Sequence, residues 1–211
     1  MRGKITLRKN GENIVMGNSF IQKIKNKIFM LRFNKAGADK KALMLKDKVY
    51  HMGENCLIYT SLIGTEPYLI SIHDNVIVAA NVRFLNHDIS VFNVRRYLNC
   101  SNYIDKVGKI ELFDNCFIGA GSILMPNCSV GKNSVIAAGS IVVGNIPDNE
   151  VWGGVPAKKI MDIDTYAQKV LAQSQNYPWI DRIGSMTNCE LIRERQQYFF
   201  GEKNEDIIHR A

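Results

Sequence analysis

The chain has 211 residues, of which 46% are apolar and 22% are charged, and its net charge is +7. This composition excludes a chain that is disordered throughout, and the length suffices for one compact domain with an extension. No uncharged stretch reads as a membrane helix, and the first residues lack the apolar core of a signal peptide. The five cysteines are scattered without a CxxC pair, which argues against a disulfide scaffold or a zinc ribbon. We therefore expect a cytoplasmic protein with reduced thiols.

The first fifty residues form a basic N-terminal arm. Residues 1–50 carry a net charge of +10, whereas residues 51–211 carry −3. Residues 5–15 are predicted to form a short hairpin or an extended segment, and residues 20–33 have the spacing of a basic amphipathic helix. The arm fits either a solvated basic face or weak contact with a membrane surface through residues 1–35. It lacks interleaved aromatic residues that stack on bases, so we expect no nucleic-acid partner.

A six-residue repeat governs residues 51–160. An aliphatic residue leads each hexad of the longest run, at Leu112, Ile118, Leu124, Val130, Ile136 and Val142. A small or moderate-sized residue follows four positions later, at Cys116, Ser122, Cys128, Ser134, Ser140 and Ile146. An earlier block from Met52 to Phe84 shows the same pattern, with Leu62 at one of the follower positions. Three hexads make one triangular coil of short parallel strands in which both marked positions point inward. The predicted fold is mainly β, a left-handed parallel β-helix, an exception to the right-handed crossover rule.

Two insertions interrupt the phase of the repeat. Two extra residues lie between Ile58 and Ile72, and four lie between Phe84 and Leu112. The second interruption predicts a protruding loop over residues 85–111, and loops on a rigid scaffold often carry function. Residues 161–211 lack the repeat and are predicted to form a C-terminal helical extension. Its two helices are expected from Asp162 or Asp164 to about Gln173 and over Asn188–Phe199.

Two long runs carry a resemblance to a known family. The run Ile118–Val143 and the ending Ile146–Lys158, with its Gly-Val-Pro-Ala-Lys, resemble the hexapeptide-repeat acyltransferases. More narrowly, Glu66-Pro-Tyr and Asn86-His-Asp resemble the O-acetyltransferases of capsule, lipopolysaccharide and exopolysaccharide clusters. The resemblance implies a homotrimer that binds acetyl-coenzyme A between subunits, needs no metal and acetylates a sugar hydroxyl of a bacterial surface polysaccharide or its precursor. Surface glycans are often built on lipid carriers, which is consistent with a cytoplasmic enzyme whose basic arm makes weak, peripheral contact with the inner membrane.

The resemblance also implies site residues. His87 matches the family's general base, and imidazole suits this role because its ordinary pKa lies near neutrality. Asp88 and Asp105 could orient this histidine, although a solvated loop carboxylate is the simpler explanation for each. Asn81, Asn86 and Asp88 are weak candidates for contact with the acetyl or acceptor group. His73 replaces a corner glycine and is expected on the surface.

For coenzyme A, the resemblance implies backbone contacts of small residues in the later coils. Ala120 and Ala138 match these positions one coil apart. The pair Val143-Gly144 stands where many relatives have Thr-Lys, so a phosphate contact is weaker there. Lys158 is the better partner for a phosphate or ribose, with Lys159 as its neighbour.

Several other functions stay open on the sequence alone. The same scaffold serves antibiotic O-acetyltransferases and N-acyltransferases of nucleotide amino-sugars. A zinc hydratase of the γ-carbonic anhydrase type needs three converging histidines, and only His73 and His87 lie in the prism region. A non-enzymatic binder driven by the basic arm is the remaining class.

Overall fold

The computed structural model describes residues 7–9, 12–14, 17–102 and 104–201. The chain forms two compact units, Met1–Ile163 and Asp164–Ala211. The first unit holds the repeat, and the second is helical. No helix among the described residues combines the length and the apolar character required to cross a membrane.

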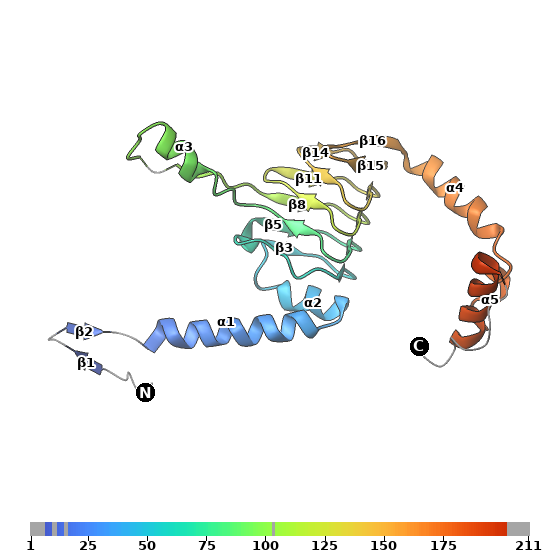
Figure 1. Cartoon of the computed structure of the whole chain (residues 1–211), viewed down its shortest axis with the longest axis horizontal. Coiled ribbons are helices and arrows are strands. Elements are labelled where there is room, and N and C mark those ends of the chain that lie inside the picture. Colours follow the sequence, from blue (N-terminus) through green and yellow to red (C-terminus); the bar gives the residue numbers. More distant parts are fainter. Residues whose placement is uncertain (1–6, 10–11, 15–16, 103, 202–211) are drawn as a thin grey trace. The chain divides into compact units, whose positions relative to one another are not determined.

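Short parallel strands build three sheets that wrap around one core (Figure 1). The first sheet contains β3 (His51–Met52), β5 (Ile70–Ile72), β8 (Ile110–Leu112), β11 (Cys128–Val130) and β14 (Asn145–Ile146). The second contains β4 (Leu57–Ile58), β6 (Ile77–Val78), β9 (Phe117–Ile118), β12 (Val135–Ile136), β15 (Glu150–Gly154) and β16 (Ala157–Asp162). The third contains β7 (Arg83–Phe84), β10 (Ile123–Leu124) and β13 (Ile141–Val142). The chain visits the sheets in this order once per coil, which is the architecture of the predicted left-handed β-helix.

The burial of the side chains confirms the inward positions predicted from the six-residue repeat. Every leading residue from Leu112 to Val142 is fully buried, and the followers from Cys116 to Ile146 are at most 3% exposed. Fully burying one aliphatic side chain of this size stabilises the folded state by about 1.5–3 kcal/mol. The prediction for Leu62 is wrong, because this side chain is 42% exposed. Leu62 pairs in register with the outward-facing Arg83, so Ile63 takes the inward position that Phe84 holds one coil later, and Thr60 is buried with it.

The buried cysteines are wall-filling residues. Cys56, Cys116 and Cys128 lie on one phase of the repeat and are unpaired thiols. Burial raises the pKa of Cys116 and that of Cys128 to about 12. At neutral pH both therefore stay as neutral thiols, which a narrow apolar interior accommodates.

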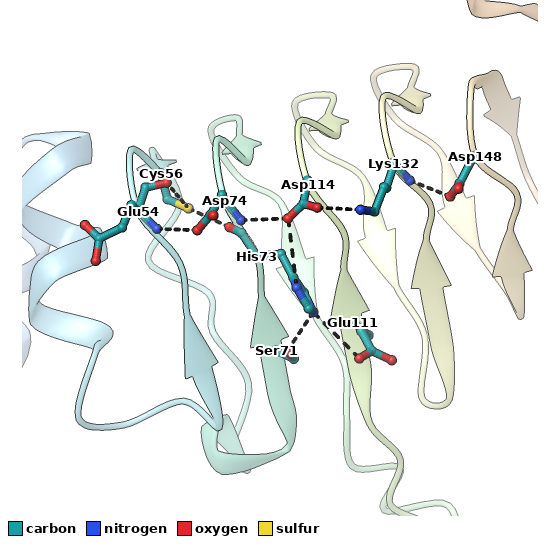
Figure 2. Close-up of polar contacts among 9 residues, drawn as sticks. All are labelled: Glu54, Cys56, Ser71, His73, Asp74, Glu111, Asp114, Lys132 and Asp148. Atoms are coloured by element: carbon teal, nitrogen blue, oxygen red, sulfur yellow. Dashed lines mark hydrogen bonds and ion pairs between the residues drawn. The ribbon is translucent and has the colours of Figure 1, made fainter.

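The corner between the first and second sheets shows how successive coils are tied together. Asparagines on this corner, such as Asn75 and Asn115, have positive φ, which suits a tight turn. Beside them, acidic side chains accept backbone N–H groups of the preceding coil (Figure 2). Asp74 Oδ1 accepts from Glu54 N at 2.8 Å, and Asp114 Oδ1 accepts from Asp74 N at 3.2 Å. The acidic residues of this corner therefore stabilise the stacking of one coil on the next.

The insertions leave the prism at the corner between the third and first sheets. The first forms the 3₁₀ turn η1 (Pro67–Leu69), and the second carries α3 (Val91–Tyr97) away from the coils (Figure 1). The predicted loop ends too late, because Ile110 already lies in β8 and is fully buried. The excursion therefore spans residues 85–109, and its helix was not predicted.

The N-terminal arm is helical next to the prism. Helix α1 (Gly17–Lys35) extends the predicted helix at both ends, and the unpredicted α2 (Ala38–Leu45) lies between it and the first coil. Strands β1 (Leu7–Lys9) and β2 (Glu12–Ile14) pair antiparallel, so the hairpin is the correct alternative for that part of residues 5–15. The rest of that segment lies outside the described residues.

The prism ends in an antiparallel hairpin of β15 and β16, which the sequence did not predict. The second unit contains α4 (Ile163–Gln175), η2 (Ile180–Arg182) and α5 (Asn188–Phe200), close to the two predicted helices. A capping box begins α5, because Thr187 and Glu190 bond to each other's backbone N–H groups.

Candidate active site

The candidate site begins where the second insertion leaves the prism. His87 follows β7, and the returning limb of the excursion pairs with it through a bridge to Val107. The first insertion lies directly below, one coil earlier. Gly64 permits this close stacking, because it has φ +79° and a Cβ there would lie 2.6 Å from Asn86 Oδ1. Both insertions are thereby packed against the same histidine.

His87 lies between two carboxylates. Its Nδ1 is 3.2 Å from Glu66 Oε1, and its Nε2 is 3.2 Å from Asp105 Oδ1. Glu66 comes from the first insertion and Asp105 from the returning limb of the second. A carboxylate at one ring nitrogen fixes the tautomer and stabilises the imidazolium that forms when the other nitrogen takes a proton.

Glu66 is held rigidly by its neighbours. The Asn86 amide spans its backbone: Nδ2 donates to the Glu66 carbonyl, and Oδ1 accepts from Glu66 N at 3.4 Å. A hydrogen bond from the Tyr68 hydroxyl, together with His87, lowers the pKa of Glu66, so this carboxylate is ionised near neutral pH. Asn86 itself is 1% exposed and holds the Glu66 backbone through both ends of its amide, so it acts as a clamp.

The other two carboxylates of the loop have different environments. The Asp105 side chain is 41% exposed, about twice the 21% of Glu66. Asp88 contacts Lys106 Nζ at 2.7 Å and accepts the backbone N–H of Ser90. These bonds lower the pKa of Asp88 to about 2. Asp88 therefore ties the two limbs of the excursion together and is not paired with His87.

A cavity of about 250 Å³ adjoins the histidine. It lies between the first insertion and the start of the second. Its lining residues are Leu62, Gly64, Thr65, Arg83, Phe84, Leu85, Asn86 and His87. A small substituent next to the imidazole would fit in this volume.

The predicted coenzyme A residues Ala120 and Ala138 lie on another corner, between the second and third sheets. Both are exposed, and Gly139 N donates to the Ala120 carbonyl at 2.8 Å, so the two alanines stack in successive coils. Asn81 lies on this same corner with φ +60°. Within one chain, the third sheet separates these residues from His87.

The remaining predicted contacts are divided between two places. Val143 and Gly144 follow β13, on the His87 corner but in later coils, and Val143 is 62% exposed. Lys158 and Lys159 lie in β16. Lys159 is engaged with Glu150 and Asp162 at 2.7 Å each. Lys158 has no ion-pair partner among the residues that the structure describes.

The sequence signals for the two carboxylates were incomplete. The sequence indicates Asp105 only as one of two loop carboxylates that could orient His87, and it indicates Glu66 only through the resemblance of Glu66-Pro-Tyr to a family motif. The usable signal for Glu66 is the two-residue insertion before Ile72, because an insertion one coil below a protruding loop must emerge next to it. Over the described ranges, no group of three His, Cys, Asp or Glu side chains is placed to hold a metal ion.

Comparisons with known sequences agree with this architecture. Residues 109–144 match the family model "Bacterial transferase hexapeptide (six repeats)". The chain is 39% identical over 123 residues to Protein CapG of Staphylococcus aureus, covering 57% of this chain and 70% of CapG. It is 33% identical over 114 residues to the galactoside O-acetyltransferase of Escherichia coli, covering 54% of each. The chain thus spans most of CapG but about half of the other relative.

Solved structures show the same fold. A galactoside acetyltransferase in complex with coenzyme A superposes with a TM-score of 0.50 at 25% identity, covering 72% of this chain and 86% of that one. A maltose O-acetyltransferase from Clostridium difficile gives a TM-score of 0.50 at 24% identity, covering 69% and 89%. Together with the repeat and the similarity to CapG, these matches establish that the chain belongs to the hexapeptide-repeat acyltransferase superfamily.

Proposed function

We propose that this acyltransferase transfers the acetyl group of acetyl-coenzyme A to a sugar hydroxyl, with His87 as the general base. The observation that carries the proposal is the pairing of His87 with the clamped carboxylate Glu66 beside a cavity. The similarity to proteins named as sugar O-acetyltransferases, one of them solved with coenzyme A, supports the donor and the acceptor class. We further propose a bacterial surface polysaccharide, or its precursor, as the acceptor.

The chemistry requires one proton transfer and one acyl transfer. His87 Nε2 takes the proton of the acceptor hydroxyl as its oxygen attacks the thioester carbonyl, and the ring becomes imidazolium beside ionised Glu66. The tetrahedral oxyanion collapses, the C–S bond breaks, and the proton passes from His87 to the departing thiolate. A backbone N–H of a coil is the simplest donor to the oxyanion.

A homotrimer would complete the site. The His87 corner and the Ala120 corner lie at opposite edges of the third sheet, so one chain cannot bring both to the same ligand. In a ring of three chains, the His87 corner of one subunit would meet the Ala120 corner of its neighbour. Coenzyme A would then lie between subunits, along Ala120 and Ala138 and towards Val143 and Gly144.

The lysines near the end of the prism would bind the nucleotide end of the donor. Lys159 is already neutralised by Glu150 and Asp162, and both carboxylates raise its pKa. Lys158 is exposed and free of such contacts in the described chain, so we assign it the phosphate contact in preference to Lys159.

We also propose weak contact of α1 with an anionic membrane surface. Helix α1 contains five basic residues and no acidic residue. Ile24, Ile28 and Leu31 share one face, and each is 43–56% exposed. An apolar stripe flanked by lysines suits the interface of an anionic bilayer, where precursors on lipid carriers would be found.

A thioester-release assay tests the proposal. Wild-type protein and acetyl-coenzyme A are incubated with a panel of sugars, glycan fragments, amino-sugars and antibiotics, and free thiol is measured. We expect turnover with sugar hydroxyl acceptors, and His87→Ala should lower kcat by about 10²–10⁴-fold. Turnover confined to amino-sugars or antibiotics would overturn the acceptor class.

His73→Ala is the matched control. His73 also lies on the prism surface between two carboxylates, 3.8 Å from Glu111 and 4.0 Å from Asp114, but on a different corner (Figure 2). This variant should retain activity. Equal loss in both variants would show that the effect is structural, and full activity of His87→Ala would refute the base assignment.

A further inference from the structure

The excursion that carries α3 contains a second cavity, which the proposed reaction does not use. It measures about 420 Å³ and is lined by Phe92, Arg95, Arg96, Asn99, Cys100 and Ser101. We call it the α3 pocket. Phe92, Arg95 and Arg96 are spaced i, i+3 and i+4, so one face of α3 presents an aromatic ring and two guanidinium groups. Phe92 is 54% exposed.

Some charged side chains of the excursion have an ion-pair partner and others do not. Residues 85–109 contain six charged side chains, of which four are paired. Asp88 pairs with Lys106, Asp105 with His87, and Lys109 with Glu111. The other two, Arg95 and Arg96, have no carboxylate partner among the described residues. The α3 pocket is therefore the place where the loop concentrates positive charge.

Arg95 is also built into the pocket wall. Its Nη2 donates to the Ser101 carbonyl at 3.3 Å, while its Nε is buried and has no hydrogen-bond partner within the described chain. Arginines in the last turn of a helix are favoured by the helix dipole, but the dipole does not account for a buried, unsatisfied N–H. Guanidinium groups bind oxyanions through pairs of parallel N–H bonds, and Arg95 and Arg96 place two such groups in the lining of one pocket.

We infer that the α3 pocket binds the anionic group of an acidic saccharide acceptor. The ligand chemistry is a carboxylate or a phosphate on a sugar, held by Arg95 and Arg96 and packed against Phe92. The inference rests on the proposed function, because the two limbs of the loop that bears the pocket meet next to His87. Asp88 N bonds to the Lys106 carbonyl, and Val107 pairs with His87. A saccharide that reacts at His87 would thus meet this loop with its neighbouring groups.

Kinetics with three matched acceptors test the inference. The probes are a methyl glucoside, a methyl glucuronide and a glucose phosphate, which separate neutral, carboxylate and phosphate sugars. We expect KM for at least one anionic probe to rise about tenfold or more in Arg96→Gln and in Arg95→Gln/Arg96→Gln, with kcat retained. Neutral-sugar kinetics should not change. Equal use of neutral and anionic sugars by the wild type would overturn the inference.

Controls separate this inference from the proposed function. Arg193→Gln removes an exposed guanidinium from α5 and should leave every KM unchanged. Binding of the anionic probes is also measured by NMR without acetyl-coenzyme A. Arginine-dependent binding without turnover would support the pocket while refuting the acetyl transfer. Turnover that does not depend on the arginines would support the acetyl transfer and refute the role of the α3 pocket. Dissociation of the oligomer in Arg96→Gln would assign the arginines to a subunit contact and overturn the inference.

Discussion

The two carboxylates at His87 have unequal roles. A general base needs one ring nitrogen fixed and the other open to the acceptor hydroxyl. Glu66 is fixed by the Asn86 clamp and by Tyr68, whereas Asp105 is the more exposed group on a loop limb. We therefore take Glu66 as the positioning residue at Nδ1. Asp105 occupies the place at Nε2 that an acceptor hydroxyl would take.

This assignment predicts opposite outcomes for two isosteric variants. Glu66→Gln should lower kcat by at least about tenfold, because the imidazolium loses its counter-charge, while KM for acetyl-coenzyme A stays constant. Asp105→Asn should keep kcat within about threefold, because the contact it weakens must open during turnover. Melting temperatures control for folding. A larger loss in Asp105→Asn than in Glu66→Gln would reverse the two roles.

At the scale of elements, the sequence predicts what the repeat determines. Inward positions such as Leu124 and Ser122 could be assigned because each coil repeats the same inward geometry. Where the chain leaves the repeat, no periodicity constrains it, and Leu62, α2, α3 and the hairpin of β15 and β16 were mispredicted or missed. The same limit applies to the site. His87 followed from a family motif, whereas its pairing with Glu66 depends on two insertions that pack one coil apart.

Helix α1 carries a prediction of its own. Replacing Ile24, Ile28 and Leu31 with serine should abolish co-sedimentation with vesicles that contain anionic lipid, because the exposed apolar stripe is lost while the lysines remain. Wild-type protein should bind anionic vesicles more strongly than neutral ones. Leu43→Ser, on the exposed side of α2 at 71% exposure, is the control and should bind like the wild type. If wild-type protein did not co-sediment with anionic vesicles, the proposed membrane contact would be refuted.

At the scale of the whole molecule, the three faces of the prism differ in polarity. The outward residues of the second sheet are in register across four coils: Leu57, Ile77, Phe117 and Val135. The outward residues of the first sheet are polar: His51, Ser71, Glu111, Ser129 and Asn145. On the third sheet, the outward ladder of Leu62, Ile123 and Ile141 is interrupted by Arg83. An uninterrupted apolar ladder, as on the second sheet, is typical of a surface that another protein covers. We propose that this ladder forms part of the contact between subunits of the proposed trimer.

A charged residue introduced into this ladder should therefore dissociate the proposed trimer into monomers. Phe117 is 37% exposed in the single chain, so Phe117→Asp should be tolerated by the fold yet bury a carboxylate at the contact. Light scattering should report three times the chain mass of 23.9 kDa for the wild type and a monomer for the variant. Activity should fall with it, because His87 and the Ala120 corner would no longer meet. Asn145→Asp adds the same charge to the polar face and should remain trimeric and active. A wild-type monomer with full activity would refute both the trimer and the shared site.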